Sequence, residues 1–171
     1  MAELTTQDKL QPALLDRLTD DESDQKVEAR DKRVISMRRL RECVLRDLSW
    51  LLNTSPLSQT EDLTDFPFAK QSVLDYGIAD LAGITLSGLD PGELERRIKQ
   101  CILDFEPRIL RRTVKVRAVL TSDTEHRNAI AFEIEGELWG QPVPTRLYLK
   151  TEVDLEDGRM SVQDRTEAGP A

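Results

Sequence analysis

Carboxylates are the most numerous side chains in this sequence that could carry out chemistry. The chain of 171 residues holds 32 Asp and Glu against 24 Lys and Arg. A pair of carboxylates is what a glycosidase needs as acid and base. With so many acidic residues, however, such a pair arises by chance. The few aromatic residues also offer no stacking platform for a sugar, so the carboxylates alone do not predict a hydrolase.

Other catalytic patterns are missing from the sequence. His126 is the only histidine and lies in a polar turn, which argues against a Ser-His-Asp triad and against a histidine metal site. No Walker loop or dinucleotide-type glycine pattern occurs. Cys43 and Cys101 fall on apolar faces of predicted helices, so we expect two buried thiols and no disulfide. We therefore predict no enzyme activity, no cofactor, no metal and no small-molecule substrate.

The segment Glu106-Pro107-Arg108 is the most informative group of polar residues. Glu106 is expected at a helix C-terminus, where the helix dipole disfavours an anion by roughly 0.3–1 kcal/mol. Pro107 fixes the backbone, and the fork of Arg108 is able to hold a carboxylate with two hydrogen bonds. Either the turn clamps a partner chain, or Glu106 and Arg108 form an intramolecular surface pair worth little. Physical arguments alone favour the intramolecular pair. The clamp predicts that Arg108→Ala weakens complex formation while the isolated domain stays folded.

Two helices must position this turn. The first covers residues 34–52, because apolar residues recur there at three- and four-residue spacing. Its buried stripe is Met37, Leu40, Val44, Leu48 and Leu51. The second starts with Asp90 as N-cap, Pro91 at the first helical position and Glu93 completing a capping box. Its buried stripe is Leu94, Ile98, Cys101, Ile102 and Phe105, and Pro107 ends it.

Residues 54–78 link the two helices. Residues 54–71 have the composition of a loop, and Phe66 and Phe68 flank a proline in a chain with few aromatics. We therefore expect these two aromatics to pin the loop to the core. Residues 72–78 form either a short strand or a helical turn that ends at Gly77.

Three strands follow the second helix, each with apolar residues alternating with polar ones. Their inward residues are Val114, Val116, Ala118 and Leu120; Ile130, Phe132, Ile134 and Leu138; and Leu147, Leu149, Thr151 and Val153. Polar turns at 121–128 and 139–144 fit antiparallel connections. We predict an α+β fold in which two main helices pack on one face of a three-stranded antiparallel sheet, with four strands as the alternative. The edges of such a sheet are either protected or used to add a strand from a partner.

The two ends of the chain differ from this domain in composition. We predict an acidic N-terminal segment at 1–33, the α+β domain at 34–155 and a flexible tail at 156–171. The first segment contains a short apolar island, Leu14-Leu15-Asp16-Arg17-Leu18. An island of one or two helical turns is not stable alone in water, so it docks either on this domain or on a partner.

Net charge and hydropathy indicate which partners and which compartment to expect. The net charge of −8 opposes binding to nucleic acid and to anionic membranes. No signal peptide and no membrane-spanning stretch are recognisable, so we expect a cytoplasmic protein.

Four segments, in this order, resemble the TssE family, the lysozyme-like wedge proteins of the type VI secretion baseplate. They are Leu14-Leu15-Asp16-Arg17-Leu18, Asp47-Leu48-Ser49-Trp50-Leu51-Leu52-Asn53-Thr54, Ser72 with Tyr76-Gly77, and Glu106-Pro107-Arg108. The resemblance spans roughly residues 12–153. The family usually has leucine after Glu-Pro-Arg, where this chain has Ile109. The family is related to a small baseplate wedge protein of contractile-tail phages.

The resemblance implies structural work in a cytoplasmic baseplate. The implied partners are the wedge proteins TssF and TssG and the sheath subunits, which share a strand-pairing mode with the family. The implied partner-binding residues are Glu106, Pro107 and Arg108 in the turn, with Leu14, Leu15, Arg17 and Leu18 in the island. A peptidoglycan hydrolase with Glu106 as general acid is the alternative that the lysozyme-like label suggests. A generic cytoplasmic adaptor is what composition alone predicts.

Overall fold

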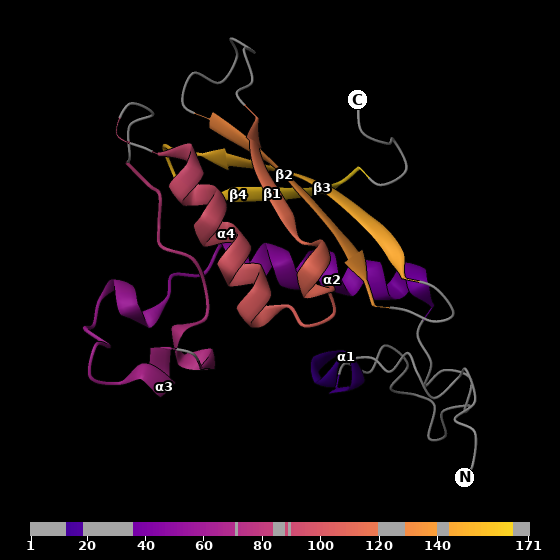
Figure 1. Cartoon of the computed structure of the whole chain (residues 1–171), viewed down its shortest axis with the longest axis horizontal. Coiled ribbons are helices and arrows are strands. Elements are labelled where there is room, and N and C mark those ends of the chain that lie inside the picture. The colour runs from indigo at the N-terminus through magenta and orange to yellow at the C-terminus, as the bar shows by residue number, and fades with distance from the viewer. Residues whose placement is uncertain are drawn as a thin grey trace.

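A computed structural model places helices α2 and α4 beside a four-stranded sheet (Figure 1). It describes residues 13–18, 36–70, 72–83, 88, 90–119, 129–139 and 144–165. The predicted turn that contains His126, the last strand residue Leu120 and most of the N-terminal segment lie outside the described residues. Among the described residues, no helix combines the length and apolar character needed to cross a membrane.

Helix α4 begins where the sequence predicted, and α2 lies within the predicted range 34–52 but begins at Met37. Helix α2 spans Met37–Leu52, and the Ser36 hydroxyl caps it by accepting the backbone N–H of Arg39 at 3.1 Å. Helix α4 spans Pro91–Phe105, and Asp90 caps it through the N–H of Gly92. The predicted capping box is replaced by another arrangement, because the Glu93 carboxylate pairs with two arginines of its own helix.

The sheet has four antiparallel strands in the order β1-β2-β3-β4. The strands are β1 Lys115–Val119, β2 Ala129–Leu138, β3 Thr145–Asp154 and β4 Met160–Asp164. The α+β prediction is confirmed in its four-stranded form. Residues 160–164, predicted as part of a flexible tail, form the edge strand β4. Their apolar residues, Met160 and Val162, are too few to show the alternation by which a strand is recognised.

The core lies between the helices and one face of the sheet. Helix α4 packs against β1, α2 packs against β4, and the two helices contact each other (Figure 1). The predicted apolar stripes are buried there: Leu48, Ile98 and Phe132 are fully enclosed. Cys43 and Cys101 are also buried and free, as expected.

The other face of the sheet carries alternating columns of charge. Basic residues of β1 and β3 and acidic residues of β2 lie on this face, and the registers bring them together. The pairs are Lys115 with Glu135, Arg117 with Glu133, Lys150 with Glu133, and Arg146 with Glu137. Opposite charges on neighbouring strands support a solvated sheet face.

Short elements fill the remainder of the described chain. They are α1 Leu14–Leu18, η3 Leu57–Gln59, α3 Pro67–Lys70, η4 Val73–Asp75 and η6 Arg111–Thr113. The helical alternative for residues 72–78 is therefore correct. The expectation for Phe66 and Phe68 is wrong, because both side chains are exposed. Leu63, next to them in sequence, supplies the buried contact instead.

Candidate functional site

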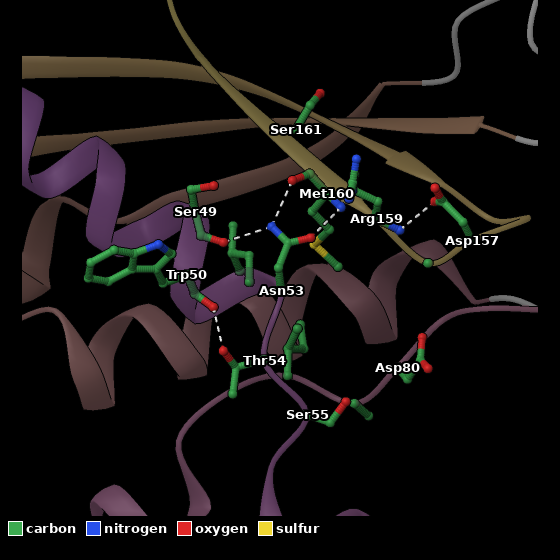
Figure 2. Close-up of a pocket in the computed structure, with 14 residues that line it drawn as sticks. Ser49, Trp50, Asn53, Thr54, Ser55, Asp80, Asp157, Arg159, Met160 and Ser161 are labelled. Carbon is green, nitrogen blue, oxygen red and sulfur yellow. Dashed lines mark hydrogen bonds between the residues drawn. The ribbon is translucent and has the colours of Figure 1, made fainter.

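A hollow of about 640 Å³ lies between the end of α2 and the β3–β4 turn (Figure 2). The Asn53 side chain donates to the carbonyls of Ser49 at 2.7 Å and Met160 at 2.8 Å, and its oxygen accepts the N–H of Met160 at 2.9 Å. Thr54 and Asp157 likewise bond to nearby backbone. Asn53 thus joins α2 to β4, and we assign the hollow a structural role.

The turn after α4 is fixed at both ends by backbone hydrogen bonds. The N–H of Glu106 donates to Ile102 of α4 at 2.9 Å. The carbonyl of Arg108 accepts the N–H of Trp139, just after β2, at 2.7 Å. Ile109 then forms a bridge with Leu138. The turn therefore has a single position between the helix layer and the sheet.

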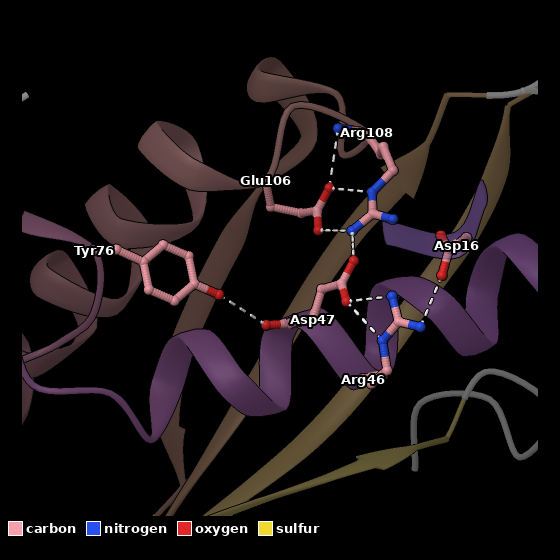
Figure 3. A network of polar contacts seen from close by, with 6 residues as sticks. All are labelled: Asp16, Arg46, Asp47, Tyr76, Glu106 and Arg108. Atoms are coloured by element: carbon pink, nitrogen blue, oxygen red, sulfur yellow. Dashed lines mark hydrogen bonds and ion pairs between the residues drawn. The ribbon is translucent and has the colours of Figure 1, made fainter. Parts of the chain in front are cut away.

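Glu106 and Arg108 pair with each other inside the molecule (Figure 3). Arg108 Nε lies 2.7 Å from one carboxylate oxygen of Glu106, and Arg108 Nη2 lies 2.5 Å from the other. Glu106 is only 4% exposed, whereas Pro107 is exposed and Arg108 half-buried. The intramolecular alternative is therefore present, but as a buried fork and not as a surface pair.

Asp47 of α2 extends this pair into the helix layer. Its carboxylate accepts Arg108 Nη2 at 2.6 Å, so one guanidinium nitrogen bridges Asp47 and Glu106. The Tyr76 hydroxyl donates to the backbone carbonyl of Asp47 at 3.4 Å. The Tyr76 ring meets Phe105 edge to face, with centroids 5.2 Å apart. These contacts tie the end of α4 to α2.

Arg46 and Asp16 continue the series of charges to α1 (Figure 3). Arg46 donates twice to Asp47, at 2.9 and 2.7 Å, and lies 2.7 Å from the Asp16 carboxylate. The Arg46 guanidinium also lies 5.0 Å from the centre of the Trp50 ring. We call the five side chains, Asp16, Arg46, Asp47, Glu106 and Arg108, the charge chain. It joins three helices that are far apart in sequence.

The pKa values of Arg108 and Asp16 are shifted in the sense expected for ion pairs. Burial lowers the pKa of Arg108, but hydrogen bonds and attraction from Glu106 and Asp47 outweigh it and raise that pKa. Burial raises the pKa of Asp16, but hydrogen bonds from Arg46 and Cys43 prevail and lower it. Both side chains are therefore held in their charged forms.

One hydrogen-bond donor in the charge chain lacks a partner among the described residues. Arg108 Nη1 is buried and has no hydrogen-bond partner within the described part of the chain. An arginine has five N–H donors, and most buried polar atoms find a partner. The guanidinium thus retains capacity for one more acceptor.

The apolar residues of α1 lie on the opposite side of that helix from its ion pair. Leu14, Leu15 and Leu18 are all exposed, whereas the Asp16 side chain is nearly buried. Arg17 belongs to α1, but its side chain lies outside the described residues. The sequence left open whether this island docks on the domain or on a partner. Asp16 places it on the domain, with its leucines directed outward.

The sequence did not identify Asp16, Arg46, Asp47 or Tyr76 as members of this site. Asp47 and Arg46 were visible only as charges off the apolar stripe of a helix. All but Arg46 fall inside the segments that carry the family resemblance, which is the signal that would have found them. Among the described residues, no three His, Cys, Asp or Glu side chains are grouped as a metal ion requires.

Comparison with known proteins places the chain in a family. A family model described as baseplate wedge protein gp25 matches residues 38–143, which is more than half of the chain and includes most of the first predicted helix, the second helix and the Glu-Pro-Arg turn. No significant match was found among curated proteins or among solved structures. The matched family consists of structural proteins of contractile injection systems, which interact with other baseplate components. The chain therefore belongs to the baseplate wedge protein gp25 family.

Proposed function

We propose that this protein is a wedge subunit of a bacterial type VI secretion baseplate, where it acts in the cytoplasm as a structural protein and not as an enzyme. Its partners are TssF, TssG and the sheath subunits, and it helps to start sheath assembly. Family membership supports the wedge role. The four segments that resemble the TssE family support the type VI assignment.

The observation that carries this proposal is the orientation of α1. Leu14 and Leu18 are directed to solvent while Asp16 holds the helix to Arg46 at 2.7 Å. A short helix that exposes several leucines offers a partner an apolar contact at the centre of an interface. Leu14, Leu15, Arg17 and Leu18 form this proposed contact surface.

The Glu-Pro-Arg turn has a different proposed role. Glu106 is buried, so it acts by holding Arg108 and not by touching a partner. Pro107 is exposed at the tip of the turn. Arg108 has one unused donor, Nη1, which is buried in the isolated chain. A partner carbonyl or carboxylate that accepts this donor would complete the guanidinium and fix the register of the two chains.

The sheet edges support strand pairing with sheath subunits. Strands β1 and β4 are the two edges of the sheet. Each is five residues long, and edge strands present backbone groups that a partner strand is able to bond.

The geometry does not favour the hydrolase alternative. A general acid must be kept protonated, usually by an apolar site or a nearby negative charge. The Glu106 carboxylate instead binds a guanidinium through both oxygens. Both oxygens of this carboxylate are thus engaged in the ion pair.

The proposal is tested by binding of the purified full chain to a purified TssF–TssG complex. We expect wild type to bind and Leu14→Ser/Leu18→Ser to bind at least about tenfold more weakly, because central apolar contacts dominate interfaces. Both substituted side chains are exposed, so the unfolding midpoint should stay unchanged. Trp139→Ser removes another half-exposed apolar side chain and serves as the matched control.

Two results would contradict the proposal. If the wild type does not bind TssF–TssG, the type VI assignment fails. If the α1 variant binds as the wild type does, α1 is not the contact surface.

A further inference from the structure

A second group of apolar side chains is exposed on the segment between α2 and α4. Phe66 is 62% exposed, Phe68 88%, Val73 80% and Leu74 63%. Helix α3 packs against η4, and η4 packs against η3, so these residues belong to one region of the surface. Figure 1 shows this region at the margin of the molecule, away from the sheet. We call these four residues the aromatic patch.

The segment that carries the aromatic patch has a defined structure of its own. The carboxylate of Asp75 accepts the N–H of Ser58 at 2.7 Å, which closes the segment on itself. The Ser72 hydroxyl donates to the carbonyl of Ala69 at 2.8 Å. Leu63 of this segment is buried, whereas the two phenylalanines are exposed. The backbone thus holds the two phenylalanines outward, so their exposure follows from the fold and not from an unfolded loop.

Two exposed phenylalanines on an ordered backbone indicate that a binding partner covers them. Phenylalanine side chains gain free energy when they leave water, and monomeric proteins rarely gather several of them on one surface region. This chain has only four phenylalanines. Two of them lie in this patch, in a segment that also contains a buried leucine.

The charges around the aromatic patch restrict what covers it. Glu61, Asp62 and Asp65 are exposed beside it, and Lys70 is the only basic residue between positions 57 and 75. An acidic rim repels nucleic acid and anionic lipid. A second copy of this chain would bring the same acidic rim and a net charge of −8. The complementary partner is therefore basic.

The secondary structure around the patch restricts the partner further. The described residues between 57 and 75 form short helical elements and turns and contain no strand. No free strand edge is available there for a partner strand to extend. A helix satisfies its own backbone hydrogen bonds and docks through its side chains alone. A helical occupant fits this surface best.

We infer that the aromatic patch is a docking surface for an amphipathic helix of another protein, one that carries Lys or Arg beside its apolar stripe. The patch supplies the apolar contact through Phe66, Phe68, Val73 and Leu74. The carboxylates of Glu61, Asp62 and Asp65 pair with the basic side chains and set the orientation of the helix. This surface is separate in sequence from α1 and from the Glu-Pro-Arg turn, and the inference does not depend on the type VI assignment.

The test is titration of the full chain with two synthetic amphipathic helices. Both peptides carry leucines along one face; one has lysines beside them and the other glutamates. We expect the lysine peptide to bind wild type, with affinity that falls as salt rises. Phe66→Ser/Phe68→Ser should weaken binding at least about tenfold, since aromatic anchors dominate such contacts. Glu61→Lys/Asp65→Lys should exchange the preference between the two peptides.

The α1 variant Leu14→Ser/Leu18→Ser is the matched control, because it removes exposed apolar side chains at another place. It should bind the lysine peptide as wild type does. The inference is overturned if the Phe variant retains full binding, or if wild type binds both peptides equally. It is also overturned if wild type dimerises, or binds anionic vesicles, in a manner that depends on the two phenylalanines. If only the α1 variant loses TssF–TssG binding, the inference about the aromatic patch is unaffected.

Discussion

At the scale of single residues, Arg108 links the buried Glu106 to another helix. Its guanidinium holds the buried carboxylate of Glu106 through two nitrogens and reaches Asp47 on another helix. Removing one partner from a buried ion pair leaves an uncompensated charge away from water. The Glu106–Arg108 pair therefore contributes to folding, whatever it also contributes to assembly. The expectation that Arg108→Ala leaves the isolated domain unaffected does not suit this geometry.

Arg108→Met is expected to lower the free energy of unfolding by about 3 kcal/mol, because it leaves Glu106 buried without a cation. The double variant Glu106→Gln/Arg108→Met should lose less than the sum of the single variants, since neither charge then remains. Urea unfolding followed by circular dichroism measures both. Arg38→Met is the matched control, as Arg38 pairs with Glu42 on the exposed surface of α2. Equal losses for Arg108→Met and Arg38→Met would refute this account.

Asp16 should make the stability of the protein depend on pH. Its pKa lies below the ordinary value of 3.8 in the folded chain, because hydrogen bonds from Arg46 and Cys43 outweigh the effect of burial. A lowered pKa contributes stability above pH 3.8 that is lost as the pH falls through the folded pKa. Wild type should thus be more stable than Asp16→Asn at neutral pH, and the difference should vanish in acid. Unfolding curves from pH 7 downward test this, and a constant difference would contradict it.

At the scale of elements, the connection between α2 and α4 is set by close backbone packing. The N–H of Ile78 donates to the Thr54 carbonyl at 2.8 Å, and Gly77 has a positive φ of 128°. A Cβ at Gly77 would lie 2.0 Å from the Thr54 oxygen. Glycine is therefore required there both for its backbone angle and for the space. This contact brings Tyr76 beside Asp47.

Gly77→Ala is expected to destabilise the protein by more than about 2 kcal/mol, because backbone must shift to accept the methyl group. Gly83→Ala is the matched control. Gly83 also has a positive φ, but a Cβ there meets nothing within 4 Å. The Gly83→Ala variant should therefore lose only about 1 kcal/mol of its free energy of unfolding, from backbone strain. Thermal unfolding compares the two variants, and a Gly77 loss no larger than the Gly83 loss would show that the close contact is unimportant.

At the scale of the whole molecule, one core is closed by contacts between distant segments. Helix α2 is held to β4 through Asn53 and to the Glu-Pro-Arg turn through Asp47. Helix α4 covers the opposite edge at β1. Both thiols are buried, Cys101 in the core and Cys43 beside Asp16 of α1. Their accessibility therefore reports on opening of the protein at these two places.

Cys43 and Cys101 should be unreactive toward a thiol reagent until the protein unfolds. Burial raises the pKa of Cys101 to about 12, so little thiolate is present at neutral pH. Burial also raises the pKa of Cys43, assisted by the charge and hydrogen bond of Asp16. We expect both thiols to react in denaturant and neither to react quickly in buffer. Rapid labelling of one thiol in the native protein would indicate local opening around it.

Local chemistry in the sequence determined the elements of this protein. Asp90 and Pro91 placed the start of the second helix, and the periods of apolar residues identified both helices and three of the four strands. The α+β class followed, because one-sided helices and strands must bury their apolar faces against each other. The edge strand β4 was missed, since five mostly polar residues at an edge carry little pattern. The exposure of Phe66 and Phe68 was also missed, because an aromatic residue has the same local signal whether it packs inward or outward.

The tertiary structure alone decided which charges meet. Residues 16, 46, 47, 106 and 108 come from two helices and the turn after a third, and nothing in their local sequence specifies the distances between them. The sequence identified Glu106-Pro107-Arg108 as a rigid turn but left its partner open. The packing of α4 beside α2 supplies the turn with a partner in the same chain, because it brings Arg108 to Asp47. Long-range ion pairs depend on the positions of whole elements, and those positions are fixed only when the core closes.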